Sequence, residues 1–387
     1  MDRVTVVGGG LAGLTAAIAC AEGGEAEVRL IETHDAVGGR ARSTGGSYKA
    51  NLGPHVIYKD GPLWSWLRDR DILPPYAGVP LAPIRFRWQD EVRRTPPLST
   101  IPTTLRLRGR EAPVEQDFRG WVADHTNERT AAMLSAAAGV YTFHHDPGEL
   151  SAAFIWERTV RALLTARPSA RYLIGGWRAL VEALEGHARK LGVLIETGRR
   201  VEELPEPPVI IATELAQARG LLGDDSLRWL SGNTVCLDLG LRHRRGDPFV
   251  VSDLDEAGWL ERYSAADASL APEGEELVQA QMPIRPGESA EQAALRLERL
   301  LDLSLPEWRS RETWRRRQVM DGRTGALDLP GQSWRDRPAI DRGDGVFLAG
   351  DMVAAPGLLS EVSWASAIEA SKLALAAVER PALRRVA

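Results

Sequence analysis

The feature that most constrains this chain is a glycine-rich turn close to its start. A β-branched run at residues 4–7 precedes the turn, and a helical pattern follows it. The turn reads Gly8-Gly9-Gly10-Leu11-Ala12-Gly13. Gly8 permits the tight bend, Gly10 lets the backbone approach a pyrophosphate at the helix N-terminus, and Gly13 lets helix and strand pack closely. The pattern therefore predicts a strand, a phosphate-binding turn and a helix.

An acidic residue follows at the position where such units bind ribose. A second apolar run, residues 28–31, ends in Glu32, about twenty residues after Gly13. A carboxylate there can accept hydrogen bonds from both hydroxyls of an adenosine ribose. A glycine-rich turn alone is weak evidence, but here the flanking strands, the helix and the acid agree. We therefore expect dinucleotide binding rather than a fortuitous turn.

The bulk properties of the chain exclude several classes of protein. Its 387 residues exceed one ordinary core, so two domains are expected, and its 44% hydrophobic and 26% charged residues are typical of a globular protein. The net charge of −5 argues against a nucleic-acid-binding surface. No apolar run predicts a transmembrane helix and no leader precedes the first strand, so we expect a cytoplasmic protein. The apolar segment 150–156 leaves peripheral membrane contact open, with ordinary core as the alternative.

Two loops after the ribose-binding acid carry candidate cofactor contacts. The first reads Val37-Gly38-Gly39-Arg40-Ala41-Arg42. Glycines beside arginines suit a loop around phosphate, although a surface turn with solvated arginines has the same composition. In the second loop, Gly53-Pro54 forms a rigid turn beside His55. This histidine is a candidate to face a reactive ring, with a structural role as the alternative.

Segments of two kinds alternate along the chain. Patterns that suit a nucleotide-binding unit occupy residues 1–60, 166–228 and 321–387, whereas residues 61–165 and 229–320 differ in character. We therefore expect a discontinuous cofactor-binding domain with an inserted α+β substrate domain. Further elements are expected as helices at 114–123, 128–138 and 150–165, and as a short strand at 200–202.

A buried strand at residues 345–349 leads into Gly350-Asp351, and a helix is expected from residue 360 to 378. An acid at a strand end can bind ribityl hydroxyls or the waters on a pyrophosphate, and a helix N-terminus after it stabilises negative charge. A capping role for Asp351 is the alternative. Residues 345–378 are therefore predicted to form a further wall of the cofactor site.

Neither a metal site nor a disulfide framework is expected. His144-His145-Asp146 carries metal-binding side chains, but adjacent histidines point differently and no fourth ligand has suitable spacing. The two cysteines, Cys20 and Cys236, lie far apart in the sequence. We therefore interpret the histidine pair as part of a loop.

Together these motifs resemble the flavin amine oxidase and phytoene desaturase superfamily of FAD-dependent oxidoreductases. The resemblance implies an α/β fold, with a Rossmann-like FAD-binding domain of the glutathione-reductase type and an inserted α+β substrate domain. It also implies non-covalent FAD, whose adenosine half would contact Gly8, Gly10, Leu11, Ala12 and Gly13 at the pyrophosphate, Glu32 at the ribose and Val201 at the adenine edge. Gly39, Arg40 and Arg42 would lie along the phosphates, and Gly350 and Asp351 at the ribityl chain. The isoalloxazine would lie beside Gly53, Pro54 and His55, with backbone around Trp364 at flavin N1 and the C2 carbonyl.

The chain also departs from its relatives. Amine oxidases place an aromatic residue at the position of Ser363 and use a lysine near flavin N5, but no lysine lies between Lys190 and Lys372. No cysteine near the last helix can bind flavin covalently. A second dinucleotide fingerprint is lacking, because residues 322–325 have no strand before them and no helix after. Electrons are therefore expected to pass to oxygen or another acceptor, or to return to the substrate, and not to pass to NAD(P).

The leading hypothesis is an FAD-dependent oxidase, dehydrogenase or desaturase that removes a hydride from a small substrate, either apolar or amine-bearing. His55 is the candidate catalytic acid or base. One alternative is a redox-neutral, flavin-dependent isomerase or mutase. Another is a non-catalytic binding protein similar to the Rab GDP-dissociation inhibitors, which share this fold. The substrate, the electron acceptor and the oligomeric state stay open.

Overall fold

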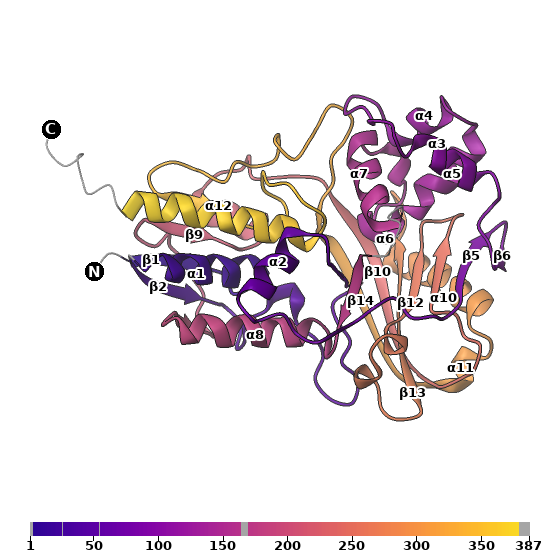
Figure 1. Ribbon diagram of the computed structural model, residues 1–387, viewed down its shortest axis with the longest axis horizontal. Helices are drawn as coiled ribbons and strands as arrows, with labels where there is room; N and C mark the ends of the chain where they lie inside the picture. Colours follow the sequence, from indigo (N-terminus) through magenta and orange to yellow (C-terminus); the bar gives the residue numbers. More distant parts are fainter. Residues whose placement is uncertain (1–2, 25, 54, 164–168, 379–387) are drawn as a thin grey trace, which may run out of the picture.

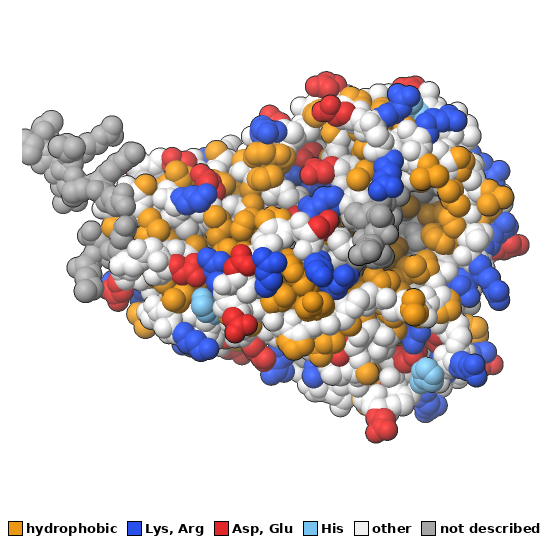
Figure 2. Space-filling view, viewed as in Figure 1, with side chains coloured by type: hydrophobic (Ala, Val, Ile, Leu, Met, Phe, Trp, Pro, Cys, Tyr) orange, Lys and Arg blue, Asp and Glu red, His pale blue; other side chains and the backbone are white. Residues whose placement is uncertain are grey.

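The computed structural model describes residues 3–24, 26–53, 55–163 and 169–378. Two parts lie side by side along the long axis: a parallel sheet with its helices on the left of Figure 1, and a larger sheet with further helices on the right. Acidic and basic side chains are interspersed over the face in Figure 2. Within the described residues, no helix is both long and apolar enough to cross a membrane.

The parallel sheet has the strand order β15-β9-β1-β2-β8. Its strands are β1 (Arg3–Val7), β2 (Glu27–Ile31), β8 (Leu194–Glu196), β9 (Val209–Ile211) and β15 (Val346–Leu348). All neighbouring strands run parallel, so their carboxyl ends share one edge of the sheet. The central strands are short, β-branched and buried, which suits a sheet packed on both faces. This confirms the predicted Rossmann-like unit.

Helices α1 (Leu11–Gly23) and α12 (Ser360–Val378) pack on this sheet, and α8 (Gly176–Lys190) packs against α1. Helix α1 lies between the other two (Figure 1). Small buried residues such as Ala17 and Ala370 allow α1 and α12 to approach closely, and Ser371 Oγ donates a hydrogen bond to the carbonyl of Ala16 at 3.2 Å. The first and last helices of the described chain therefore form one layer.

The larger sheet has seven strands in the order β14-β10-β13-β12-β11-β5-β6. Their bounds are β5 (Ile84–Trp88), β6 (Glu91–Arg93), β10 (Ser231–Arg242), β11 (Val250–Asp253), β12 (Trp259–Arg262), β13 (Glu275–Pro283) and β14 (Glu312–Ala326). Helix α10 (Ala290–Ser304) buries Leu297, Leu300 and Leu301 against it, and α11 (Trp308–Arg311) follows. Because β14 continues to Ala326, this sheet extends beyond residue 320.

The remaining elements surround the junction of the two sheets. A small sheet consists of β3 (Ile57–Tyr58), β7 (Ala170–Leu173) and β4 (Tyr76–Ala77). The helices are α2 (Pro62–Asp69), α3 (Thr100–Leu107), α4 (Phe118–Ala123), α5 (Glu128–Ala137), α6 (Gly139–Thr142), α7 (Ala152–Leu163) and α9 (Leu215–Leu222). Short 3-10 turns are η1 (Gly39–Ala41), η2 (Pro147–Glu149), η3 (Tyr263–Ala265) and η4 (Ala268–Leu270).

Some local expectations need correction. The helix expected at 114–123 begins only at Phe118, because the Asp117 side chain caps it by accepting a hydrogen bond from the Gly120 N–H at 2.8 Å. The strand expected at 200–202 was wrong: these residues form a loop, since the chain leaves the sheet and Arg199 N donates to the Glu32 carbonyl instead. The apolar segment 150–156 is core, with Leu150 fully buried.

Candidate cofactor and substrate cavity

One cavity of about 1220 Å³ begins at the carboxyl edge of the parallel sheet and continues along the seven-stranded sheet. Most residues that the sequence singled out line it, namely Gly8, Gly10, Leu11, Ala12, Glu32, Gly39, Arg40, Arg42, Gly53, His55, Val201, Gly350 and Asp351. Gly13 and Trp364 are not among the described residues that line it. Pro54 lies outside the described residues. Segments far apart in sequence therefore meet at one site.

The glycine turn has the shape of a phosphate cradle. Gly8 has φ +104°, and a side chain there would meet the carbonyl of Ala212 at 2.6 Å. A Cβ on Gly13 would lie 1.8 Å from the Gly8 carbonyl oxygen. A Cβ on Gly10, by contrast, would meet nothing within 4 Å, and no side chain caps the N-terminus of α1. The turn thus leaves open space at an uncapped helix N-terminus, as an anionic group requires.

Glu32 lies at the end of β2, beside this turn. Its Oε2 accepts a hydrogen bond from the Gly9 N–H at 2.6 Å, and its Oε1 accepts one from the His34 N–H at 2.9 Å. The side chain is buried but lines the cavity. A carboxylate held by backbone donors keeps lone pairs for hydroxyl groups, so the site fits a ribose at this position.

Arg40 and Asp351 both line the cavity and form an ion pair. Arg40 comes from η1, and Asp351 follows Gly350 after β15. The guanidinium also donates to the carbonyl of Arg323 at 2.6 Å. Asp351 raises the pKa of Arg40 further above its ordinary value. This pair closes the wall between the glycine turn and the loop before α12.

His55 is buried at the middle of the cavity wall. The amide nitrogen of Asn51 lies 2.7 Å from its Nε2, and the ring stacks on Tyr263 with 4.2 Å between centroids. The Tyr263 hydroxyl accepts a hydrogen bond from the His55 backbone N–H at 3.0 Å. Burial lowers the pKa of His55 to about 3, so the ring is neutral at physiological pH.

The far half of the cavity contains a polar cluster that the sequence analysis missed. Glu261 of β12 lines the cavity, and accepts hydrogen bonds from the Tyr172 hydroxyl at 2.5 Å and the Trp259 indole at 3.1 Å. Burial raises the pKa of Glu261. Tyr172 lies in β7 and Trp259 in β12, and these strands belong to different sheets. No sequence motif in either strand indicates that these residues are neighbours of Glu261.

Helix α12 begins at the cavity with Ser360 and Ser363 on its wall. Trp364 is half-buried, and its indole nitrogen has no hydrogen-bond partner among the described residues. Ser366 Oγ accepts from the Gly350 N–H at 2.9 Å, which fixes the start of α12 against the end of β15. No lysine is among the described lining residues.

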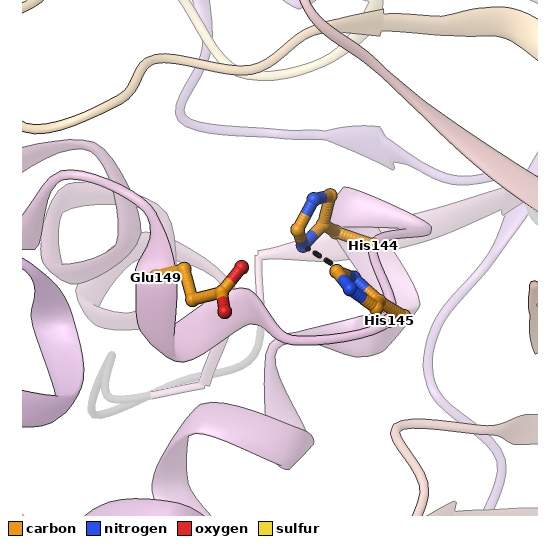
Figure 3. A group of neighbouring side chains, drawn as sticks. All are labelled: His144, His145 and Glu149. Atoms are coloured by element: carbon orange, nitrogen blue, oxygen red, sulfur yellow. Dashed lines mark hydrogen bonds between the residues drawn. The ribbon is translucent and has the colours of Figure 1, made fainter. Parts of the chain in front are cut away.

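A separate group lies outside the cavity. Ligand atoms of His144, His145 and Glu149 lie within 4.8 Å of one another. Figure 3 shows the Glu149 carboxylate directed toward the two imidazole rings, whose Nδ1 atoms are 3.3 Å apart. His144 Nδ1 also lies 2.9 Å from the Asp146 carbonyl. The sequence pattern missed Glu149 as a neighbour, because η2 turns it back toward the histidines.

Comparisons with known proteins agree with this geometry. Residues 6–70 match a family model described as an NAD(P)-binding Rossmann-like domain. No curated protein sequence matches the chain.

Solved structures resemble nearly the whole chain. An oxidoreductase from Methanosarcina mazei has a TM-score of 0.77 at 15% identity, covering 98% of this chain and 100% of that one. Cyclohexylamine oxidase from Brevibacterium oxydans IH-35A gives 0.71 at 14%, covering 98% and 100%. Reduced UDP-galactopyranose mutase gives 0.71 at 13%, covering 97% and 96%. The chain therefore has the fold that these oxidoreductase, amine oxidase and mutase structures share.

Proposed function

We propose that this protein is an FAD-dependent oxidoreductase that oxidises a small, largely apolar substrate in the far half of the cavity. The observation that carries the proposal is the single cavity, which joins a phosphate cradle and a ribose-binding acid to a wall of aromatic side chains. FAD would supply hydride acceptance, and the protein would position the substrate and exclude water. The two parts of the fold would then correspond to a cofactor domain (1–60, 166–228 and 321–387) and a substrate domain (61–165 and 229–320), except that the end of β14, up to Ala326, belongs to the sheet of the substrate domain.

The residues that line the cavity fit non-covalent FAD in the order that the motifs suggest. We propose that the pyrophosphate lies on the turn at Gly8–Gly13, the adenosine on Glu32 and Val201, and the ribityl chain near Asp351. The isoalloxazine would lie between the segment that ends at His55 and the start of α12.

We retain His55 as the side chain to test at the ring. Its low pKa favours a role as a neutral hydrogen-bond partner over that of a proton donor. Asn51 holds the ring orientation, and Asn51 is itself fixed because its Oδ1 accepts from the Trp177 N–H at 3.0 Å. The imidazole can therefore orient a substrate without carrying charge.

The decisive experiment has two steps. The purified protein, with FAD added, should show a bound-flavin absorption spectrum, and heat should release intact FAD because no covalent attachment is expected. Anaerobic addition of amines, amino acids or isoprenoids should then bleach the flavin with one of these classes. No flavin spectrum even with added FAD would refute the proposal and leave the binding-protein alternative.

A redox-neutral mutase is the second candidate, favoured by the structural similarity to UDP-galactopyranose mutase. Such an enzyme would need a reductant for turnover and would yield no net oxidised product. Product analysis with dithionite-reduced protein separates it from an oxidase.

A further inference from the structure

Arg158 is a buried cation on the cavity wall. It lies on α7, is 6% exposed and lines the cavity. Its guanidinium carbon lies 3.6 Å from the centroid of the Phe154 ring, so one face rests on an aromatic surface. Nη1 donates to the Phe154 carbonyl at 3.0 Å, and Nη2 to the Gly357 carbonyl at 3.4 Å. Two carbonyls leave most of the five N–H donors of the guanidinium free.

Arg158 differs from the other buried arginines of the described chain, which are paired with aspartates. Arg87 lies 2.7 Å from Asp253, Arg337 lies 2.7 Å from Asp328, and Arg311 lies 2.8 Å from Asp247. No carboxylate of a described residue lies within 4 Å of Arg158. Among the buried arginines of the described chain, Arg158 is therefore the one without an ion-pair partner within 4 Å.

The surroundings make this charge an anion site. Burial and then the neighbouring charge of Arg337 lower the pKa of Arg158 to about 10, so it stays protonated at neutral pH. Arg337 also lines the cavity, but two bonds to Asp328, at 2.9 and 2.7 Å, neutralise it. Arg158 thus has no carboxylate in direct contact, and Glu157 and Asp328 act on it only from more than 4 Å. An unpaired buried charge is costly, and an anion of the right shape removes that cost.

The position points to the substrate rather than to the cofactor. Arg158 contacts Gly357, in the loop before α12, and its cavity neighbours include Tyr141 and Leu359. The phosphate cradle is built from other segments, at Gly8–Gly13. A single guanidinium matches a monoanion, because a dianionic phosphate would keep one charge unpaired.

We propose that Arg158 binds the carboxylate of an otherwise apolar substrate, at the end of the cavity formed by α6, α7 and the loop before α12. This inference rests on the proposed function and narrows its substrate to apolar carboxylic acids. The guanidinium would form two parallel hydrogen bonds to the carboxylate, which fixes the orientation of the apolar body toward the flavin.

The test compares matched probes on FAD-loaded protein. 3-Phenylpropionate, 3-phenylpropanamide and phenethyl phosphate are titrated by calorimetry and by perturbation of the flavin spectrum. The acid should bind about tenfold or more tightly than the amide, which corresponds to about 1.4 kcal/mol, and more tightly than the phosphate. Arg158→Gln should remove the preference, and Arg158→Lys should keep part of it.

Arg108→Gln is the matched control, since Arg108 is exposed at the end of α3 and does not line the cavity. It should retain the full preference for the acid. Melting temperature and FAD content show that each variant is folded, and a modest fall is expected for Arg158→Gln because it loses two hydrogen bonds to carbonyls and its contact with Phe154. If Arg158→Gln does not fold, Arg158→Lys carries the test, and equal affinity of that variant for acid and amide would overturn the inference.

Equal affinity for acid and amide, failure of the acid to bind, tighter binding of the phosphate, or a preference that survives in Arg158→Gln would each overturn the proposal. The flavin spectrum is recorded first, so failure of FAD binding is distinguished from failure of this inference. Calorimetry with the protein as purified tests whether Arg158 binds the carboxylate, whether or not FAD is bound.

Discussion

Arg40 and Asp351 form a two-bond ion pair across 311 positions of the chain, with both guanidinium–carboxylate contacts at 2.8 Å. The pair joins the loop that follows the first βαβ unit to the end of β15. Neither residue is fully buried, so the pair contributes at most about 1 kcal/mol to folding. Its larger effect is to hold two proposed cofactor contacts at a fixed separation.

We expect Arg40→Gln and Asp351→Asn each to weaken FAD binding by about tenfold, because each change also releases the other residue. The double variant should bind FAD little worse than either single variant, since the two residues act as a unit. Flavin fluorescence titration measures the three affinities. Strictly additive losses would contradict a coupled role, and thermal melts of the FAD-free proteins serve as the folding control.

Gly10→Ala and Gly13→Ala should fail in different ways. The Cβ on Gly10 has free space in the protein alone, so Gly10→Ala should melt close to wild type yet lose FAD, whose pyrophosphate would need that space. The Cβ on Gly13 would lie 1.8 Å from the Gly8 carbonyl oxygen, so Gly13→Ala should be destabilised even without FAD. Melting temperature and flavin content of the two proteins separate the effects. Normal FAD binding by Gly10→Ala would show that the cradle is not used.

His55→Ala should retain FAD but lose turnover by about tenfold or more, because the ring orients the substrate without binding the nucleotide. Turnover with the substrate that bleaches the flavin is the measurement, and the flavin-to-protein ratio is its control. Unchanged turnover would remove His55 from the mechanism.

His55 should also make folding stability depend on pH. Its folded pKa of about 3 lies below the unfolded value of 6.5, so the unfolded chain takes up a proton first as pH falls. Stability should therefore decrease between pH 6.5 and about 3, by up to about 1.4 kcal/mol per pH unit from this group. Urea unfolding of wild type and His55→Gln from pH 7 to 4 checks this: the variant should show the shallower dependence. Equal slopes would contradict the assignment.

Cys20 should be unreactive in the folded protein. It is fully buried between α1 and α12, and burial raises its pKa to about 11. Burial also raises the pKa of Cys236, which lines the cavity. Ellman's reagent at pH 8 should therefore detect neither thiol until denaturant is added. Rapid labelling of Cys20 in the native protein would show that the α1–α12 contact opens readily.

The part of the candidate site around the glycine turn could be predicted because its signals are local. The glycine turn, its helix and Glu32 lie within one βαβ unit, and each residue type follows from the shape of the turn. The part of the cavity that lies along the seven-stranded sheet could not be predicted in the same way. Glu261, Tyr172 and Arg158 meet only because β12, β7 and α7 pack around one space, and the neighbours of each depend on pairing between distant segments. Likewise, the structure alone shows which residue caps the start of a helix, as Asp117 does for α4.

The order of strands in the parallel sheet also governs when this site can form during synthesis. β1 is made first, yet its neighbour β9 lies some two hundred residues later in the sequence, and β15 pairs with β9 only after Leu348 has been made. Helix α12, which covers α1, comes last of all. The edge of β1 that faces β9 must therefore wait for more than half of the chain, whereas the seven-stranded sheet is complete once Ala326 has emerged. Such long-range pairing makes folding slow. The part of the molecule with the parallel sheet is thus the first to be started during synthesis and the last to be completed.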